Sequence, residues 1–273
     1  MLATKKNTKS NNRPIGVFDS GVGGLSVLKE LWKLLPKENF IFIADQLYVP
    51  YGEKTKKELV GLGLRVTDYF IQHHDIKLMV VACNTSTCST IGELRKKYTL
   101  PIVGTVPAVK SAAESTKTKT IAIISTPSTS QSETLKKLIK DNCKNIKVFN
   151  IGCKNLENAV EHGELNSEEV QTLLLKYLSE VRDSDADYLV LGCTHYVFIN
   201  KTIAKFVGSK IKLIDGNKAI ARQTQSLLQN HILETDQKKL GKTVYFTTGD
   251  STQFSKVASK LLKEKIKAKS VKI

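Results

Sequence analysis

Short apolar runs recur along the chain, and each is bounded by glycine, proline or small polar residues. Runs of this kind, rich in valine and isoleucine, are typical of strands buried on both faces of a sheet. The sequence predicts eight such strands, at Ile15–Phe18, Phe40–Ala44, Leu78–Ala82, Pro101–Val103, Ile121–Ile124, Val148–Ile151, Tyr188–Leu191 and Ile211–Ile214.

Helical patterns lie between these runs. The clearest are residues 25–35, 55–72, 131–141, 167–182 and 217–230, and an amphipathic helix is predicted around Phe254–Leu262. Regular alternation of strand and helix predicts an α/β fold with mainly parallel sheets flanked by helices.

Two of the predicted strands end alike. Leu78–Cys88 reads LMVVACNTSTC and Tyr188–Val197 reads YLVLGCTHYV, so each apolar run leads to a cysteine and a polar turn. Ligands of open α/β sheets bind beyond the carboxyl ends of the strands. We therefore expect two similar lobes with the active site in the cleft between them.

A glycine-rich turn follows the first predicted strand. Asp19–Gly24 reads DSGVGG, but a dinucleotide fingerprint would need its third glycine where Ser26 stands. Backbone N–H groups of such a turn can bind an anion, including a carboxylate. A tight structural turn capped by Asp19 is the other interpretation. A second loop contains Pro50–Gly52, which either offers backbone donors to a ligand or is a plain surface turn.

Cys83 and Cys193 stand out because they follow the two matching strands. Two reactive thiols suit racemisation, which needs a base on one face of a carbon and an acid on the other. A thiol is a poor base until it ionises, near pH ~8.5, but N–H dipoles at a strand end favour the thiolate. His195 can assist the second thiol or contact the substrate. The site also has to stabilise a carbanionic state with oriented donors in a dry cleft. Short polar residues able to hold a zwitterionic substrate are Asn84, Thr85 and Thr194.

The other three cysteines, Cys88, Cys143 and Cys153, are interpreted as structural thiols, with Cys88 on the following helix and facing away from Cys83. The chain has five cysteines and no CxxC pair, so no metal site is predicted.

Charge raises the alternative of nucleic-acid binding, because the net charge is +16. Residues 1–13 contribute +4 and residues 256–273 contribute +6, and no recognition motif accompanies them. We interpret them as a flexible basic tail and a lysine-rich helix face. No membrane span and no secretion signal are predicted, so we expect a cytoplasmic protein.

From about Pro14 to Leu262 the chain resembles the glutamate racemase family, within the aspartate/glutamate racemase superfamily. The motifs that carry the resemblance are DSGVGGLS at 19–26, PYG at 50–52, ACNT at 82–85, GCTHY at 192–196 and TTGD at 247–250. They are specific together and in this order, although each alone is not.

The resemblance implies a cofactor-independent, two-base enzyme that supplies D-glutamate for cell-wall peptidoglycan and works as a homodimer. It implies that Cys83 is the base for D-glutamate and Cys193 the base for L-glutamate. Asp19 would support Cys83, His195 would support Cys193, and Glu161 would be a further acid near Cys193. The substrate-binding positions it implies are Asp19, Ser20, Tyr51, Gly52, Asn84, Thr85, Thr194 and His195.

The resemblance also implies that the second lobe is an insertion in the first. Residues 14–104 and 216–273 would form the first lobe, residues 105–215 the second, and residues 1–13 the tail. The chain departs from the family where prolines are usual, at Lys154, Asn158 and Val197.

Two other enzymatic interpretations stay open at this point. One is aspartate racemisation or a related cysteine-dependent isomerisation on the same scaffold. The other is a cysteine hydrolase with His195 as its base, which leaves the second matched cysteine unexplained.

Overall fold

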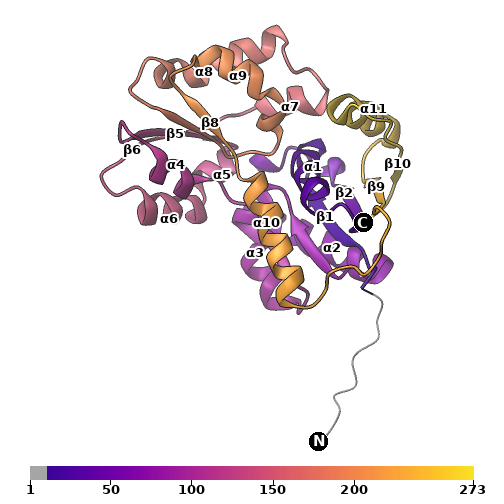
Figure 1. Cartoon of the computed structure of the whole chain (residues 1–273). Coiled ribbons are helices and arrows are strands. Elements are labelled where there is room, and N and C mark those ends of the chain that lie inside the picture. The colour runs from indigo at the N-terminus through magenta and orange to yellow at the C-terminus, as the bar shows by residue number, and fades with distance from the viewer. Residues whose placement is uncertain (1–10) are drawn as a thin grey trace, which may run out of the picture.

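Two parallel sheets, each covered by helices, build the molecule (Figure 1). The computed structural model describes residues 11–273. We call the part built on the six-stranded sheet the first lobe and the part built on the four-stranded sheet the second lobe. The predicted α/β class with two lobes is confirmed.

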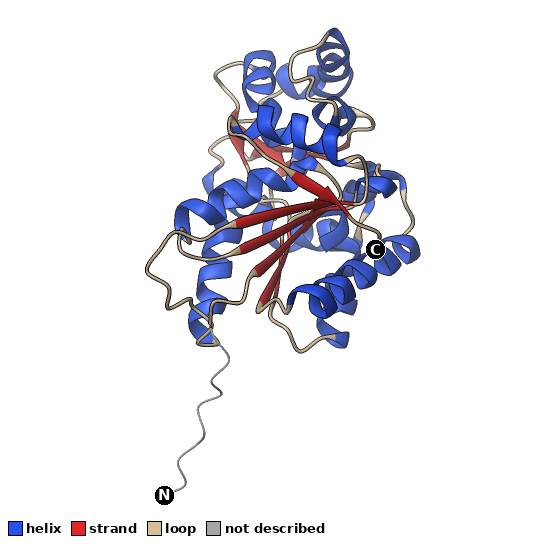
Figure 2. Ribbon diagram, turned by 90° about the vertical axis from the view of Figure 1, so that its right-hand side faces the viewer, coloured by secondary structure: helices blue, strands red, loops and turns tan. Residues whose placement is uncertain are grey.

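The sheet of the first lobe has the strand order β10-β9-β2-β1-β3-β4, and every pairing is parallel. Its strands are β1 (Ile15–Asp19), β2 (Phe40–Ala44), β3 (Leu78–Val81), β4 (Ile102–Gly104), β9 (Thr243–Thr247) and β10 (Ala268–Ser270). Its helices are α1 (Leu25–Leu34), α2 (Lys56–His74), α3 (Asn84–Lys97), α10 (Asn217–Asn230) and α11 (Ser251–Leu262). Figure 2 shows helices on both sides of the fanned strands.

The sheet of the second lobe has the order β6-β5-β7-β8 and is also parallel. Its strands are β5 (Thr120–Ser125), β6 (Lys147–Gly152), β7 (Tyr188–Leu191) and β8 (Lys212–Ile214). The helices of this part of the chain are α4 (Val109–Ser115), α5 (Pro127–Gln131), α6 (Glu133–Asn142), α7 (Leu156–Glu161), α8 (Glu168–Arg182) and α9 (Asn200–Val207).

Burial explains why the apolar runs form strands. All five residues of β1 and all five of β2 are buried, as expected for central parallel strands with helices on both faces. The largest core cluster contains Val17 and Phe42 of the first lobe as well as Ala122 and Leu189 of the second. The hydrophobic core is therefore continuous across the two lobes.

All eight predicted strands are present, but β9 and β10 were not predicted. Only Tyr245 and Thr247 of β9 are buried, and β10 reads Ala-Lys-Ser with two exposed residues. Edge strands often carry lysine, which weakens their apolar signal. The predicted helix 131–141 was wrong at its start, because Ser132 caps α6 and Gln131 ends the separate helix α5.

Residues 1–10 of the predicted basic tail lie outside the described residues. The three residues that follow are bonded to the first lobe: Lys77 Nζ donates to the carbonyl of Asn11 at 2.6 Å, and Arg13 pairs with Asp75 at 3.3 Å. The lobe boundaries at 104/105 and 215/216 stay predictions.

Candidate active site

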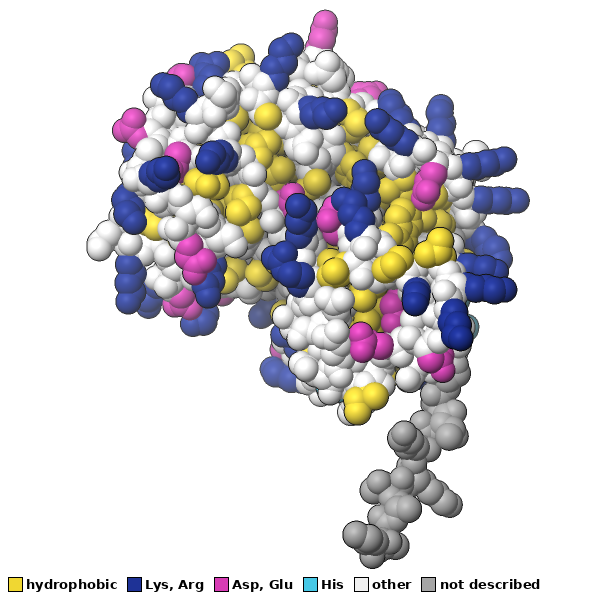
Figure 3. Space-filling model, in the orientation of Figure 1, with side chains coloured by type: hydrophobic (Ala, Val, Ile, Leu, Met, Phe, Trp, Pro, Cys, Tyr) yellow, Lys and Arg dark blue, Asp and Glu magenta, His cyan; other side chains and the backbone are white. Residues whose placement is uncertain are grey.

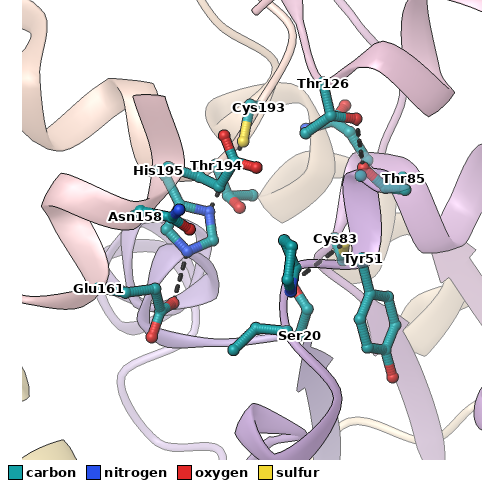
Figure 4. Close-up of a pocket in the computed structure, with 15 residues that line it drawn as sticks. Ser20, Tyr51, Cys83, Thr85, Thr126, Asn158, Glu161, Cys193, Thr194 and His195 are labelled. Carbon is teal, nitrogen blue, oxygen red and sulfur yellow. Dashed lines mark hydrogen bonds and ion pairs between the residues drawn. The ribbon is translucent and has the colours of Figure 1, made fainter. Parts of the chain in front are cut away.

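Both singled-out cysteines lie at strand ends, and both line one cavity between the lobes (Figure 4). Cys83 comes two residues after β3 ends, and Cys193 two residues after β7 ends. The cavity volume of about 20 Å³ has room for roughly one water molecule, so the cleft is closed in this structure. A substrate the size of an amino acid does not fit this cavity unless the cleft opens.

Cys83 is the N-cap of α3, and its Sγ accepts a hydrogen bond from the Ser86 backbone N–H at 3.4 Å. Its Sγ also lies 3.6 Å from Ser20 Oγ. Burial raises the pKa of the Cys83 thiol, and the charge of Asp19 raises it further. This half of the site therefore favours the protonated thiol.

Asp19 ends β1 and connects the two halves of the site. Its Oδ1 accepts from the Gly21 N–H at 2.9 Å and from Ser20 Oγ at 3.4 Å, and its Oδ2 accepts from Thr194 Oγ1 at 3.2 Å. Burial raises its pKa to about 6, against the attraction of His195 and these hydrogen bonds. Ser20 Oγ lies between Asp19 Oδ1 and Cys83 Sγ, and the supporting role of Asp19 stays a prediction.

The Cys193 half has a different character. Cys193 Sγ lies 3.6 Å from His195 Nδ1, and His195 Nε2 lies 2.6 Å from Glu161 Oε1. Burial alone lowers the pKa of His195, but hydrogen bonds with Cys193 and Glu161 outweigh it and raise the pKa well above its usual value. For Glu161, burial raises the pKa of the carboxyl, but the hydrogen bond and charge of His195 hold that pKa below its usual value. An imidazolium donates from both nitrogens, so a charged His195 can donate to Glu161 and to the sulfur of Cys193 at the same time.

The glycine-rich turn makes room for the second lobe. A Cβ on Gly21 would lie 1.7 Å from Glu161 Oε1, and a Cβ on Gly23 would lie 2.4 Å from His195 Nδ1. The anion that the turn binds is a carboxylate of the protein itself, because the Val22 N–H donates to Glu161 Oε1 at 2.7 Å.

Gln46 belongs to the same network and was not among the predicted site residues. Its Nε2 donates to Glu161 Oε2 at 2.7 Å, and its Oε1 accepts from Thr247 Oγ1 at 2.9 Å. Two groups of the first lobe, Val22 and Gln46, thus hold the carboxylate that orients His195 in the second.

Every predicted substrate-binding residue except Asp19 lines the cavity; they are Ser20, Tyr51, Gly52, Asn84, Thr85, Thr194 and His195. The Tyr51 hydroxyl already donates to Asp45 Oδ2 at 2.6 Å. Thr85 Oγ1 lies 2.8 Å from Thr126 Oγ1 across the two lobes. Asn84 Oδ1 is buried without a hydrogen-bond partner among the described residues.

Three further residues of the second lobe line the cavity and were not predicted as site residues from the sequence, namely Thr126, Glu157 and Asn158. Thr126 directly follows β5, so the rule that ligands bind beyond strand ends could have found it. Glu157 and Asn158 lie on the short helix α7, for which no pattern was recognised.

The remaining cysteines lie outside this cavity. Cys88 is on α3, as expected, Cys143 follows α6, and Cys153 is fully buried after β6. Burial raises the pKa of all three thiols. Across residues 11–273, no helix has the length and apolarity of a membrane span, and no cluster of three or more His, Cys, Asp or Glu is arranged to hold a metal ion.

Comparison with known proteins identifies the class to which this fold and site belong. The profile of the Asp/Glu/hydantoin racemase family matches residues 16–224. The chain belongs to that family, which confirms the superfamily expected from the motifs.

Within it, several similar relatives are glutamate racemases. The chain is 39% identical to the glutamate racemase of Herpetosiphon aurantiacus over 246 residues, covering 90% of this chain and 96% of that protein. The crystal structure of a glutamate racemase isoform from Bacillus anthracis superposes with a TM-score of 0.88 at 30% identity, covering 96% of this chain and 98% of that one. A Francisella tularensis glutamate racemase in complex with D-glutamate superposes with a TM-score of 0.82 at 28% identity, covering 96% and 98%. The expected enzyme class, an isomerase of the glutamate racemase type, is confirmed.

Proposed function

We propose that this protein interconverts L- and D-glutamate by moving the Cα proton between two thiols, Cys83 and Cys193, without a cofactor. The observation that supports the proposal is their placement at strand ends of opposite lobes, lining one closed cavity. Each thiol can reach one face of a carbon held between them. The homologous Francisella enzyme binds D-glutamate, which supports the substrate.

In the L-to-D direction, the Cys193 thiolate removes the Cα proton and the Cys83 thiol delivers a proton to the opposite face. The reverse reaction starts from a Cys83 thiolate. His195, held by Glu161, lies beside Cys193 Sγ and can donate to it when the thiol has lost its proton, and Asp19 acts on Cys83 through Ser20. The two halves therefore begin from different protonation states.

Proton transfer by positioned groups contributes about 10²–10⁴-fold, which is too little for an α-proton beside an ionised carboxylate. Oriented donors in a water-excluded cavity have to supply the rest. Side chains available for this task, or for holding the amino and carboxylate groups, are Ser20, Asn84, Thr85, Thr126 and Thr194.

Racemisation in heavy water tests the proposal. With L-glutamate and no added cofactor, we expect D-glutamate that carries deuterium at Cα, while the remaining L-glutamate stays largely unlabelled early in the reaction. This asymmetry follows from two bases, because each thiol exchanges with solvent separately. Absence of both racemisation and exchange would overturn the proposal. Activity on aspartate but not on glutamate would show that the protein is an aspartate racemase.

Serine variants assign the two bases. Cys83→Ser and Cys193→Ser are each expected to lower kcat/KM by about 10²–10⁴-fold. Cys143→Ser is the control, since Cys143 lies away from the cavity. Equal losses in all three, with a shared fall in thermal stability, would indicate general destabilisation and not catalysis.

We also propose, from the resemblance, that the enzyme is a cytoplasmic homodimer that supplies D-glutamate for peptidoglycan. Light scattering of the purified protein checks the dimer: a mass near twice 30.3 kDa is expected, and a monomer at working concentrations contradicts it.

A further inference from the structure

One carboxyl group in the cavity has no assigned task. Glu157 lines the cavity with 6% of its surface exposed, and its Oε2 has no hydrogen-bond partner among the residues the structure describes. A buried polar atom of this kind is costly unless something else completes it. The orphaned oxygen indicates that a bound molecule supplies the partner.

Glu161, four residues further along α7, lines the same cavity but is fully engaged. Its Oε1 accepts from Val22 and pairs with His195, and its Oε2 accepts from Gln46. Glu157 is therefore the carboxyl of this helix with capacity left for a ligand.

The surroundings of Glu157 disfavour a second anion. Burial raises its pKa and the charges of Glu53 and Glu161 add to this, although a hydrogen bond from its own backbone N–H and the charge of His195 act in the opposite direction. Glu53 is itself paired with Lys154 at 3.2 Å. Titratable groups that sense the charge of Glu157 from neighbouring elements are Cys153 and Tyr196. A neutral carboxyl has one O–H donor, whereas an ionised carboxyl can only accept.

We propose that Glu157 is a substrate-binding residue that, as the neutral acid, donates a hydrogen bond from Oε2 to a carboxylate of glutamate. The inference rests on the proposed function and extends it to substrate recognition. Glutamate brings two carboxylates into a cavity whose α7 face already carries the Glu161 anion. A neutral donor at Glu157 avoids adding repulsion there.

The opposite arrangement has the opposite pH signature. An ionised Glu157 that bound the substrate ammonium would bind more tightly as the pH rises through its pKa. A neutral Glu157 loses its O–H donor as the pH rises through the same range, so it binds the substrate less tightly and KM rises. The sign of the change in KM therefore separates the two arrangements.

The experiment measures kcat and KM for L- and D-glutamate between pH 5 and about 8.5, below the range where the substrate ammonium titrates. In the wild-type enzyme KM should rise with pH much more than kcat falls. Glu157→Gln keeps an N–H donor that does not titrate, so its KM should lose this pH dependence. Glu157→Val removes the donor and should raise KM by roughly 10- to 100-fold at low pH, as expected for a hydrogen bond to a charged group.

Glu164→Gln is the matched control, because it makes the same change at an exposed carboxyl just past α7. It should keep the wild-type pH profile. A pH profile of KM in Glu157→Gln that matches the wild type, or a KM that falls as pH rises, overturns the proposal. If Glu157→Val fails to fold, the Glu157→Gln profile still decides. A wild-type enzyme without racemase activity would refute the proposed function itself, whereas an active wild type matched by both Glu157 variants refutes only this inference.

Discussion

Asp19 lies at the junction between the unlike halves of the site, and its burial has a thermodynamic cost. Its hydrogen-bond partners come from both lobes, Gly21 and Ser20 on one side and Thr194 on the other. The pKa of about 6, against a usual value of 3.8, shows that these partners do not fully offset the loss of water. The site retains this buried carboxyl at the expense of stability.

The variant Asp19→Asn tests this cost. Between pH 3.8 and about 6 the folded protein holds a proton at Asp19 that the unfolded chain has released, so wild-type stability falls as pH rises through this window. Asparagine does not titrate, so the variant should gain stability relative to the wild type as the pH rises, by roughly 2.4 kcal/mol at pH 7 compared with pH 4. Urea unfolding at several pH values measures the difference, and a constant difference would contradict it. If Asp19 supports Cys83 as proposed, kcat should also fall in this variant.

At the scale of elements, the site depends on how closely α7 approaches the turn after β1. Gly21 has φ −155° and ψ −146°, so it does not lie in the left-handed region that favours glycine. Its requirement for glycine is steric, because the Glu161 carboxylate occupies the place of a side chain.

Gly21→Ala should therefore displace Glu161, break its bond from Val22 and loosen His195. We expect a large fall in kcat/KM, with a loss of about 1–3 kcal/mol of stability from overpacking. Gly61→Ala is the control, since a Cβ at Gly61 in α2 meets nothing within 4 Å. That change should leave activity intact and stabilise α2 by up to about 1 kcal/mol. Wild-type activity in Gly21→Ala would show that catalysis does not depend on the position of the Glu161 carboxylate.

Sequence and structure agree best where a signal is local. Apolar runs such as Phe40–Ala44 predict buried strands without further information, and the polar turns that follow Cys83 and Cys193 indicate that these two cysteines lie at strand ends. Gln46 and Glu157 were not predicted as site residues, because their place in the site depends on residues that are distant in the sequence. Gln46 meets Glu161 across 115 residues of chain, and no spacing in the sequence encodes that approach.

At the scale of the whole molecule, the two lobes share a core and a site. The net charge of +16 is a separate property: on the face in Figure 3, basic side chains are spread among acidic and apolar ones. One lysine of the basic C-terminal segment, Lys260, donates to the carbonyl of Gly163 at 2.7 Å and so joins the lobes. The nucleic-acid alternative rests on the charge alone, whereas family membership identifies a racemase.

Because residues of both lobes line the cavity, glutamate should stabilise both lobes together. An equilibrated mixture of the enantiomers at 100 times its dissociation constant should add about 2.7 kcal/mol to the free energy of unfolding. Calorimetry should show one transition that moves to higher temperature, with alanine at the same concentration as control. Two transitions of which only one moves would show that substrate engages a single lobe.

The return of the chain to the first sheet has a consequence for synthesis on the ribosome. All four strands of the second sheet lie between residues 120 and 214, whereas β9 and β10 join the first sheet only from Thr243 onward. Domains fold as units while the chain emerges, so the inserted lobe can fold before the lobe that surrounds it. Thr247, which holds Gln46 and through it Glu161, is among the last parts to appear. Both thiols are thus translated well before the cleft that uses them is complete, and a growing chain can hold both cysteines without being an enzyme.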